Sequence, residues 1–155
     1  MLLAYRLVRL IETHADKLAE STLARVEADP KTHDYRGRVP EEDFKAAVRE
    51  IYSHLGEWLM GKSEEEIARR YTAIGRRRAE QGVLLSELNW AILLTRDNLW
   101  EFLKAEDTLE RPAEAFGELT LLQMLEQFFD RAIYYAAVGY EQHKPVDEKS
   151  LHLVK

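Results

Sequence analysis

Three consecutive arginines in the stretch YTAIGRRRAEQG, residues 71–82, are the side chains best suited to bind a ligand. A guanidinium group holds carboxylates and phosphates through paired hydrogen bonds. On a helix, Arg76 and Arg77 point towards solvent. Arg78 instead continues an apolar line formed by Ile67, Tyr71 and Ile74. We therefore expect Arg78 to be at least partly buried.

A buried arginine needs a partner, because leaving a buried charge unpaired costs several kcal/mol. The candidate carboxylates on later helices are Glu87, Asp97, Glu101 and Asp130. Two interpretations stay open. In the commoner one Arg78 forms a structural ion pair, or its side chain extends from the last turn of the helix to reach solvent. In the other it binds an anionic ligand between helices, and the ligand-binding residues are Arg78, Tyr71 and Trp90.

A second line on the same helix carries only small residues, namely Ala68, Thr72, Gly75, Ala79 and Gly82. Such a line lets a neighbouring helix approach closely. This explains a glycine in the helix interior, where it costs about 1 kcal/mol relative to alanine.

Motifs of the common enzyme classes are missing from the sequence. It has no GxSxG elbow, no Walker loop, no GxGxxG fingerprint and no Glu-x-x-His pair of the kind that di-iron bundles use. With zero cysteines there is no thiolate zinc site and no cysteine nucleophile. The five histidines are scattered, so we expect no metal site and no enzyme activity.

Haem is the one cofactor that a single histidine could hold. His14 lies on the apolar line of the first expected helix, and His54 flanks that of the second. A histidine at such a position is more often satisfied by a carbonyl or carboxylate. We therefore expect no cofactor, with haem as the alternative that these two residues leave open.

Composition restricts the partners. The chain has 155 residues, enough for one domain, and a net charge of −6 from 22 basic and 28 acidic residues. A net acidic protein repels phosphate backbones, so no nucleic-acid partner is expected. The N-terminus is too charged for a signal peptide, and no apolar run approaches the roughly 20 residues that span a bilayer. We expect a cytoplasmic protein with no membrane insertion.

Apolar periodicity predicts helices separated by glycine and proline. The expected helices cover 2–28, 40–61, 64–81, 86–104 and 112–141. Residues 31–39 are expected to form a polar loop, and Ser63 with Glu66 a capping box. No period-two pattern predicts a strand. The expected fold is an all-α antiparallel helical bundle of about five to six helices. Residues 1–141 form one domain, and 142–155 form a tail or linker.

The helix over 112–141 carries two apolar stripes, where one would suffice for the core of a monomer. A second stripe leaves apolar surface for a partner, unless the first or second helix covers both. We predict a homodimer, the commonest closed oligomer. The residues predicted for the dimer and signal contact are Leu121, Leu125, Phe128, Phe129, Ala132 and Tyr135.

The stretch IGRRRAEQGVLLSELNWAILLTRDNLWEFL resembles the N-terminal domain of RsbR-type proteins, the RsbT co-antagonist family of the bacterial stressosome. Related domains precede some bacterial sensor kinases and regulators. The resemblance rests on Gly75, Arg78, Gly82, Leu85-Ser86 and the span from Leu99 to Leu103. The stretch FFDRAIYYAAVGYE is similar to the closing helix of that family, and the likeness covers roughly residues 5–141.

This resemblance implies a non-enzymatic sensory or regulatory domain in signal transduction. Such domains are usually dimeric and pass a signal to a protein partner or C-terminal output domain. Related stressosome sensors have a globin-like fold without haem, so a globin-like arrangement is one expected form. The alternative function is a globin-like sensor that binds haem or another small ligand. Only 14 residues follow residue 141. We therefore expect an isolated domain or a stand-alone protein.

Overall fold

All the regular structure in the described part of the chain is helical. The computed structural model describes residues 2–105 and 112–143, and these ranges contain no strand. The elements in chain order are α1 (Leu2–Thr13), α2 (Ala15–Ala28), the 3-10 turn η1 (Pro30–Thr32), α3 (Tyr35–Arg38), α4 (Glu41–Ser53), the π-helical turn η2 (Glu57–Gly61), α5 (Glu64–Glu80), α6 (Leu85–Ala105) and α7 (Pro112–Gln142). The predicted all-α helical bundle is confirmed.

Three segments differ from the sequence-based expectation. The single helix expected over 40–61 ends at Ser53, and the separate π-helical turn η2 follows it over Glu57–Gly61. The single helix expected over 2–28 divides at His14, whose φ of −102° and ψ of 20° separate α1 from α2. The loop expected over 31–39 contains η1 and α3, because its three buried side chains recur at helical spacing among polar neighbours. These side chains are Thr32, Tyr35 and Val39. The described residues therefore form seven α-helices, and the predicted tail lies outside them from residue 144 onward.

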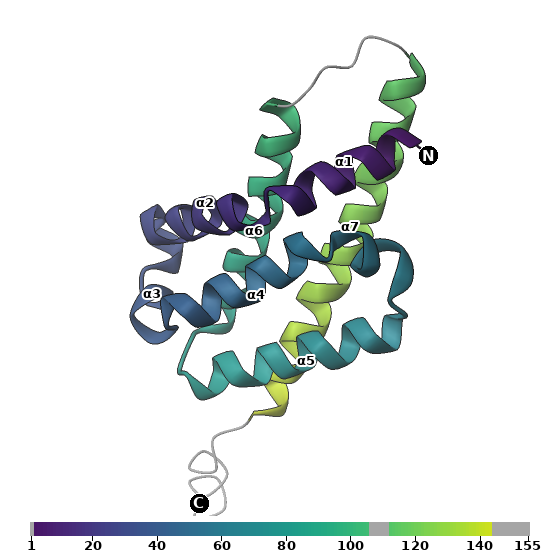
Figure 1. The fold of residues 1–155 in the computed structure, drawn as a ribbon. Coiled ribbons are helices and arrows are strands. Elements are labelled where there is room, and N and C mark those ends of the chain that lie inside the picture. The colour runs from purple at the N-terminus through teal and green to yellow at the C-terminus, as the bar shows by residue number, and fades with distance from the viewer. Residues whose placement is uncertain (1, 106–111, 144–155) are drawn as a thin grey trace, which may run out of the picture.

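The helices lie in two layers that cross each other (Figure 1). In this view α1, α2, α4 and α5 form the front layer, and α6 and α7 lie behind them. The layers are held together chiefly where α5 packs on α7 and α2 packs on α6, while α1 also reaches α7. Within the front layer α2 packs against α4.

The closest helix contact is the crossing of α5 and α7, and glycine makes it possible on both sides. A Cβ atom placed on Gly75 would overlap the carbonyl oxygen of Ala136 and lie 2.7 Å from its carbonyl carbon. A Cβ atom placed on Gly139 would meet the carbonyl group of Thr72 in the same way. The backbones therefore touch directly at this crossing. The structure confirms the close approach that the small-residue line predicts.

Aromatic side chains fill the core beside this crossing. The ring of Phe128 on α7 lies 5.7 Å from that of Tyr71 on α5 and 5.7 Å from that of Trp58 in η2. Phe129 completes the cluster at 5.1 Å from Phe128. Edge-to-face and tilted pairs at these separations are favourable beyond the area they bury. They fix η2 and α5 on α7.

A buried polar network joins α2, α4 and α6. The Tyr52 hydroxyl lies 2.7 Å from Thr22 Oγ1 and donates to the Thr95 carbonyl oxygen at 3.0 Å. Asn98 donates to Thr22 Oγ1 at 3.0 Å and accepts from Arg25 Nε at 2.9 Å. Burial raises the pKa of Tyr52 to about 12, which keeps its hydroxyl protonated at neutral pH. A satisfied network of this kind specifies how α4 sits on its neighbours.

Both ends of α5 carry strong local signals. The predicted capping box is present, since Ser63 Oγ accepts from the Glu66 amide and Glu66 Oε1 accepts from the Ser63 amide. At the other end Gly82 has a φ of +82°, and the Val83 amide donates to the Arg78 carbonyl oxygen at 3.1 Å. Glycine adopts this left-handed conformation without strain and ends the helix.

We expect Gly75→Ala to lower the free energy of unfolding by about 3 kcal/mol, because the added methyl group forces the two helix backbones apart. Urea denaturation followed by circular dichroism measures the change. Gly37→Ala is the matched control, since a Cβ atom there has no heavy atom within 4 Å. Equal stability of the two variants would contradict the direct backbone contact.

Candidate functional site

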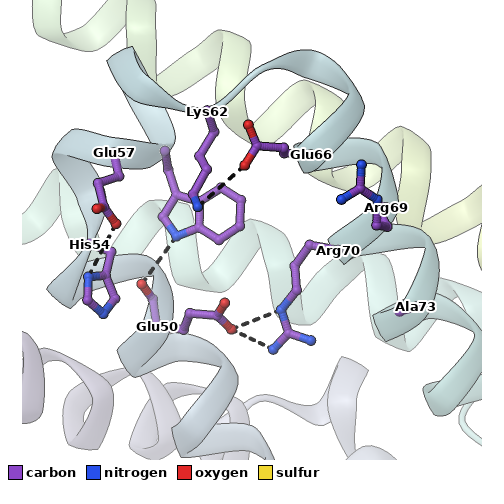
Figure 2. Close-up of a pocket in the computed structure, with 9 residues that line it drawn as sticks. Glu50, His54, Glu57, Lys62, Glu66, Arg69, Arg70 and Ala73 are labelled. Atoms are coloured by element: carbon purple, nitrogen blue, oxygen red, sulfur yellow. Dashed lines mark hydrogen bonds and ion pairs between the residues drawn. The ribbon is translucent and has the colours of Figure 1, made fainter.

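A groove runs between α4 and α5 on the front layer. It consists of two adjoining cavities of about 500 and 320 Å³, both lined by Arg70 and Ala73. The larger extends to η2 and contains Trp58 and Arg69. Figure 2 shows the side chains that line it, including Glu50 and Arg70, which are joined by dashed lines. The smaller reaches Arg78.

Two ion pairs bridge the groove from α5 to α4. Arg70 donates from Nε to Glu50 Oε2 at 2.9 Å, as drawn in Figure 2. Arg77 donates from Nε to Asp43 Oδ2 at 3.2 Å, and Gln81 Nε2 donates to the same oxygen at 3.1 Å. The two helices are antiparallel, so Asp43 near the start of α4 pairs with Arg77 near the end of α5, and Glu50 pairs with the earlier Arg70. Between the two pairs the groove is lined by alanine.

Arg78 is buried, with 3% of its surface exposed, as the sequence predicts. Its partners are neutral: Nε donates to the Tyr35 hydroxyl at 3.0 Å and Nη1 donates to Gln81 Oε1 at 3.0 Å. The sequence-based expectation of a carboxylate from α6 or α7 is wrong. Glu87, for example, accepts instead from the Asp34 amide at 2.9 Å. Among the described residues no carboxylate forms an ion pair with Arg78.

The hydrogen bonds made by Arg77 and Arg78 shift the pKa values of the groups around them. The hydrogen bond from Arg77 is the main cause that holds the pKa of the Asp43 carboxyl below its ordinary value, and the charge of Arg78 adds to it. The same bond raises the pKa of Arg77. Burial raises the pKa of Tyr35, and the neighbouring Arg78 charge opposes that rise. At neutral pH Asp43 is therefore ionised, Arg77 is charged and Tyr35 is protonated.

Trp58 lines the end of the groove nearest η2. Its Nε1 donates to the Glu50 carbonyl oxygen at 3.2 Å, and Lys62 Nζ lies 5.7 Å from its ring centre. Lys62 also pairs with Glu66 at 3.5 Å. Arg69 is exposed and has no hydrogen bond or ion pair with the described residues.

The three residues predicted to bind a ligand lie in three different settings. Arg78 lines the groove. Tyr71 is buried against Trp58 and Phe128 and does not line either cavity. Trp90 lies on α6, where its Nε1 donates to Asp29 Oδ2 at 2.9 Å and lowers the pKa of that carboxyl. The groove therefore brings Arg78 together with other residues than those predicted.

The residues predicted for a dimer contact lie mostly inside the single chain. Five of them are at most 2% exposed: Leu121, Leu125, Phe128, Phe129 and Ala132. Tyr135 is half-buried and donates to Glu64 Oε2 at 2.7 Å. The prediction named these six as a dimer and signal contact, but α5, α6 and α1 pack on α7 and bury five of them in the single chain. Homodimerisation itself stays a prediction.

The two candidate haem ligands are engaged by neighbouring groups. His14 Nδ1 lies 2.9 Å from the Leu10 carbonyl oxygen, and its ring centre is 5.6 Å from that of Phe102. His54 is exposed, with Nδ1 3.5 Å from Glu57 Oε2 (Figure 2). These contacts lend haem ligation no support. Within the described ranges no group of three or more His, Cys, Asp or Glu is placed to hold a metal ion.

The sequence analysis did not predict that Asp43 and Glu50 line a groove, although the spacing of charged residues on two helices indicates it. Along α4 and the residue that ends it, steps of four, three and four residues separate Asp43, Ala47, Glu50 and His54. The complementary line on α5 is Glu66, Arg70, Ala73 and Arg77, at the same steps. Two antiparallel helices with these lines facing each other pair Asp43 with Arg77 and Glu50 with Arg70. Comparing charge lines between neighbouring helices would have found both pairs.

The comparisons with known proteins gave one match. The sequence model of the RsbT co-antagonist protein rsbRD N-terminal domain matches residues 15–144, which include the groove and all of α2 to α7. No curated protein and no solved structure matches the chain. In the described residues no helix is long and apolar enough to cross a membrane.

We expect Asp43→Asn to be less stable than wild type at pH 7, because the charged carboxylate accepts from Arg77 and Gln81. The folded-state pKa of Asp43 lies below its unfolded value. Its contribution is therefore complete above the unfolded pKa of about 3.9 and is lost as the pH falls through the lower folded pKa. The stability difference between the two proteins should shrink below about pH 4.

Urea denaturation at a series of pH values measures this difference. Asp130→Asn is the control, since Asp130 is exposed and forms no ion pair with the described residues. A difference between wild type and Asp43→Asn that stays constant down to acid pH would contradict the assignment.

Proposed function

The chain belongs to the RsbT co-antagonist protein rsbRD N-terminal domain family, and on that premise we propose that it is a regulatory domain in bacterial stress-response signalling. We propose that it acts as a homodimer and through contact with a protein partner. The family description names a co-antagonist of another protein, which supports a protein as the partner. Family membership also supports two further parts of the proposal, that the domain is not an enzyme and that it works in the cytoplasm.

The observation that supports the dimer is a partly exposed apolar strip around an ion pair that joins α6 and α7. Arg96 Nη1 on α6 lies 3.9 Å from Glu126 Oε1 on α7, which places these two positions opposite each other. The apolar residues at helical spacing around this pair are Leu93, Trp100, Leu119, Leu122 and Ile133. Leu119 is 59% exposed and the other four are half-buried.

Burying such a strip against its copy in a second chain removes apolar surface from water. In a closed two-fold dimer this strip of one chain would lie on the same strip of the other. The proposed interface thus uses other residues of α7 than the six first predicted.

The proposed route of the signal is the packing of α5 on α7. A bound ligand or protein that favours one arrangement of α4 and α5 would change how α5 lies on α7. Because the backbones meet at Gly75 and Gly139, α5 has no compressible layer of side chains there. A displacement of α5 would therefore reach the C-terminal part of α7.

We expect wild type to have the mass of two chains in size-exclusion chromatography with light scattering, and Leu119→Glu to have the mass of one. Burying the introduced charge in the proposed interface should weaken the dimer at least tenfold, about 1.4 kcal/mol. Leu119 is exposed in the single chain, so this variant should fold normally. Leu93→Glu tests the same strip from α6.

Leu84→Glu is the matched control, because Leu84 is 55% exposed and precedes α6 away from the strip. It should leave the dimer intact. A monomeric wild type, or equal dimerisation of all four proteins, would overturn the proposed interface.

A further inference from the structure

The groove between α4 and α5 is locally positive on a chain whose net charge is −6. Its permanent cations are Lys62, Arg69, Arg70, Arg77 and Arg78. Its carboxylates are Asp43, Glu50, Glu57 and Glu66. A surplus of cations in a concave site attracts anions more strongly than the same charges on a flat surface.

Two of the five cations lack a carboxylate partner among the described residues. Arg69 is exposed and pairs with nothing in these ranges, and Arg78 is buried with two neutral partners. A buried guanidinium is the stronger of the two as a binding group, because the low local dielectric increases its attraction for an anion. The unpaired charge therefore lies at the α4–α5 cavity of about 320 Å³.

Donors remain for such an anion. Each guanidinium carries five N–H groups. Arg70, Arg77 and Arg78 each use two of them in hydrogen bonds to the described residues. Three arginines around one cavity can thus bind a carboxylate or phosphate without giving up the contacts they already make.

The rest of the groove suits an organic body attached to that anion. Ala46, Ala47 and Ala73 leave space where larger side chains would close it. Trp58 lies at the far end, in the π-helical turn η2. Turns of this type are rare and occur often at functional sites.

We propose that the α4–α5 groove binds a small organic anion, with its carboxylate or phosphate group at Arg70, Arg77 and Arg78 and its remaining part extending past Ala73 towards Trp58. Arg69 lines the larger cavity, together with Trp58, and can bind a second negative group there. Binding of the anion is independent of the proposed dimer. Only an effect of the anion on α7 rests on the proposed function.

The test uses the full chain, with inorganic phosphate and malonate as probes and chloride at equal ionic strength as the reference. Heteronuclear NMR titration should show saturable shifts of backbone amides in α4 and α5 with either probe and none with chloride. The ratio of the two affinities distinguishes a phosphate from a carboxylate as the preferred group. No saturable shift with either probe, or shifts confined to other helices, would overturn the proposal.

Ala73→Glu is the main variant, because it places a competing carboxylate in the groove at an exposed helical position and removes no existing contact. It should weaken binding of the better probe at least tenfold. Ala24→Glu makes the same change at an exposed helical alanine of α2 and should leave the affinity unchanged. Equal affinities for these two variants would overturn the site.

A second pair of variants tests whether Arg69 binds a second negative group of the probe. Arg69→Gln should weaken malonate, which carries two negative groups, more than phosphate, whereas Arg76→Gln should change neither affinity. Arg76 is exposed outside the groove, and its Nη2 donates to Gln142 Oε1 at 2.7 Å. Light scattering on the same samples keeps the two proposals distinct. A monomer that binds the probe overturns the proposed dimer alone, and a dimer that binds neither probe overturns the groove alone.

Discussion

The crossing of α5 and α7 is the contact on which the other features of the molecule depend. Two carbonyl groups occupy the places that side chains would take at Gly75 and Gly139, so the distance between these helices is fixed by their backbones. This contact joins the two layers. It sets the depth at which Tyr71 meets Phe128 and turns the opposite side of α5 towards α4. The groove exists because α5 is held on α7.

The two sides of α4 are held by interactions of different strength. On one side Tyr52 enters a buried and satisfied polar network with α2 and α6. On the other side the bridges to α5 are ion pairs whose members remain partly exposed, Arg70 by 40% and Arg77 by 59% of their side chains. Partly exposed ion pairs contribute little to stability. The contact of α4 with α2 is therefore firmly held, whereas the contact of α4 with α5 can change at little cost in stability.

The predictable part of this structure comes from short-range patterns. The capping box at Ser63, the small-residue line through Gly75 and the burial of Arg78 each follow from spacing within one helix, and each is confirmed. The partner of Arg78 could not be found in this way. Tyr35 lies in a segment whose composition indicates a loop, and its burial depends on packing against residues distant in sequence.

The failure over α7 has a related cause. Its two apolar stripes are real, but periodicity cannot tell whether a partner for them comes from the same chain or another. Three helices of the same chain pack on the side that carries Leu121 and Phe128. The part of α7 that these helices leave uncovered is less apolar than the buried side and is interrupted by Glu126. It can be identified as a strip only in the structure, where Arg96 of α6 pairs with Glu126.

The position of α5 connects the two proposals physically. One side of the helix lines a groove whose bridges are weak, and the other side meets α7 through backbone contact. An anion bound at Arg78 would add charge-assisted hydrogen bonds on the side of α5 that faces α4. It would compete with Asp43 for Arg77, and weakening this ion pair would change the position of α5. Its effect on α7 would appear near Gly139, whereas the proposed dimer strip lies around Glu126, three to four helical turns away. A dimer held at the strip would leave the C-terminal end of α7 outside the interface, where a change in the position of α5 would act through the contact at Gly139.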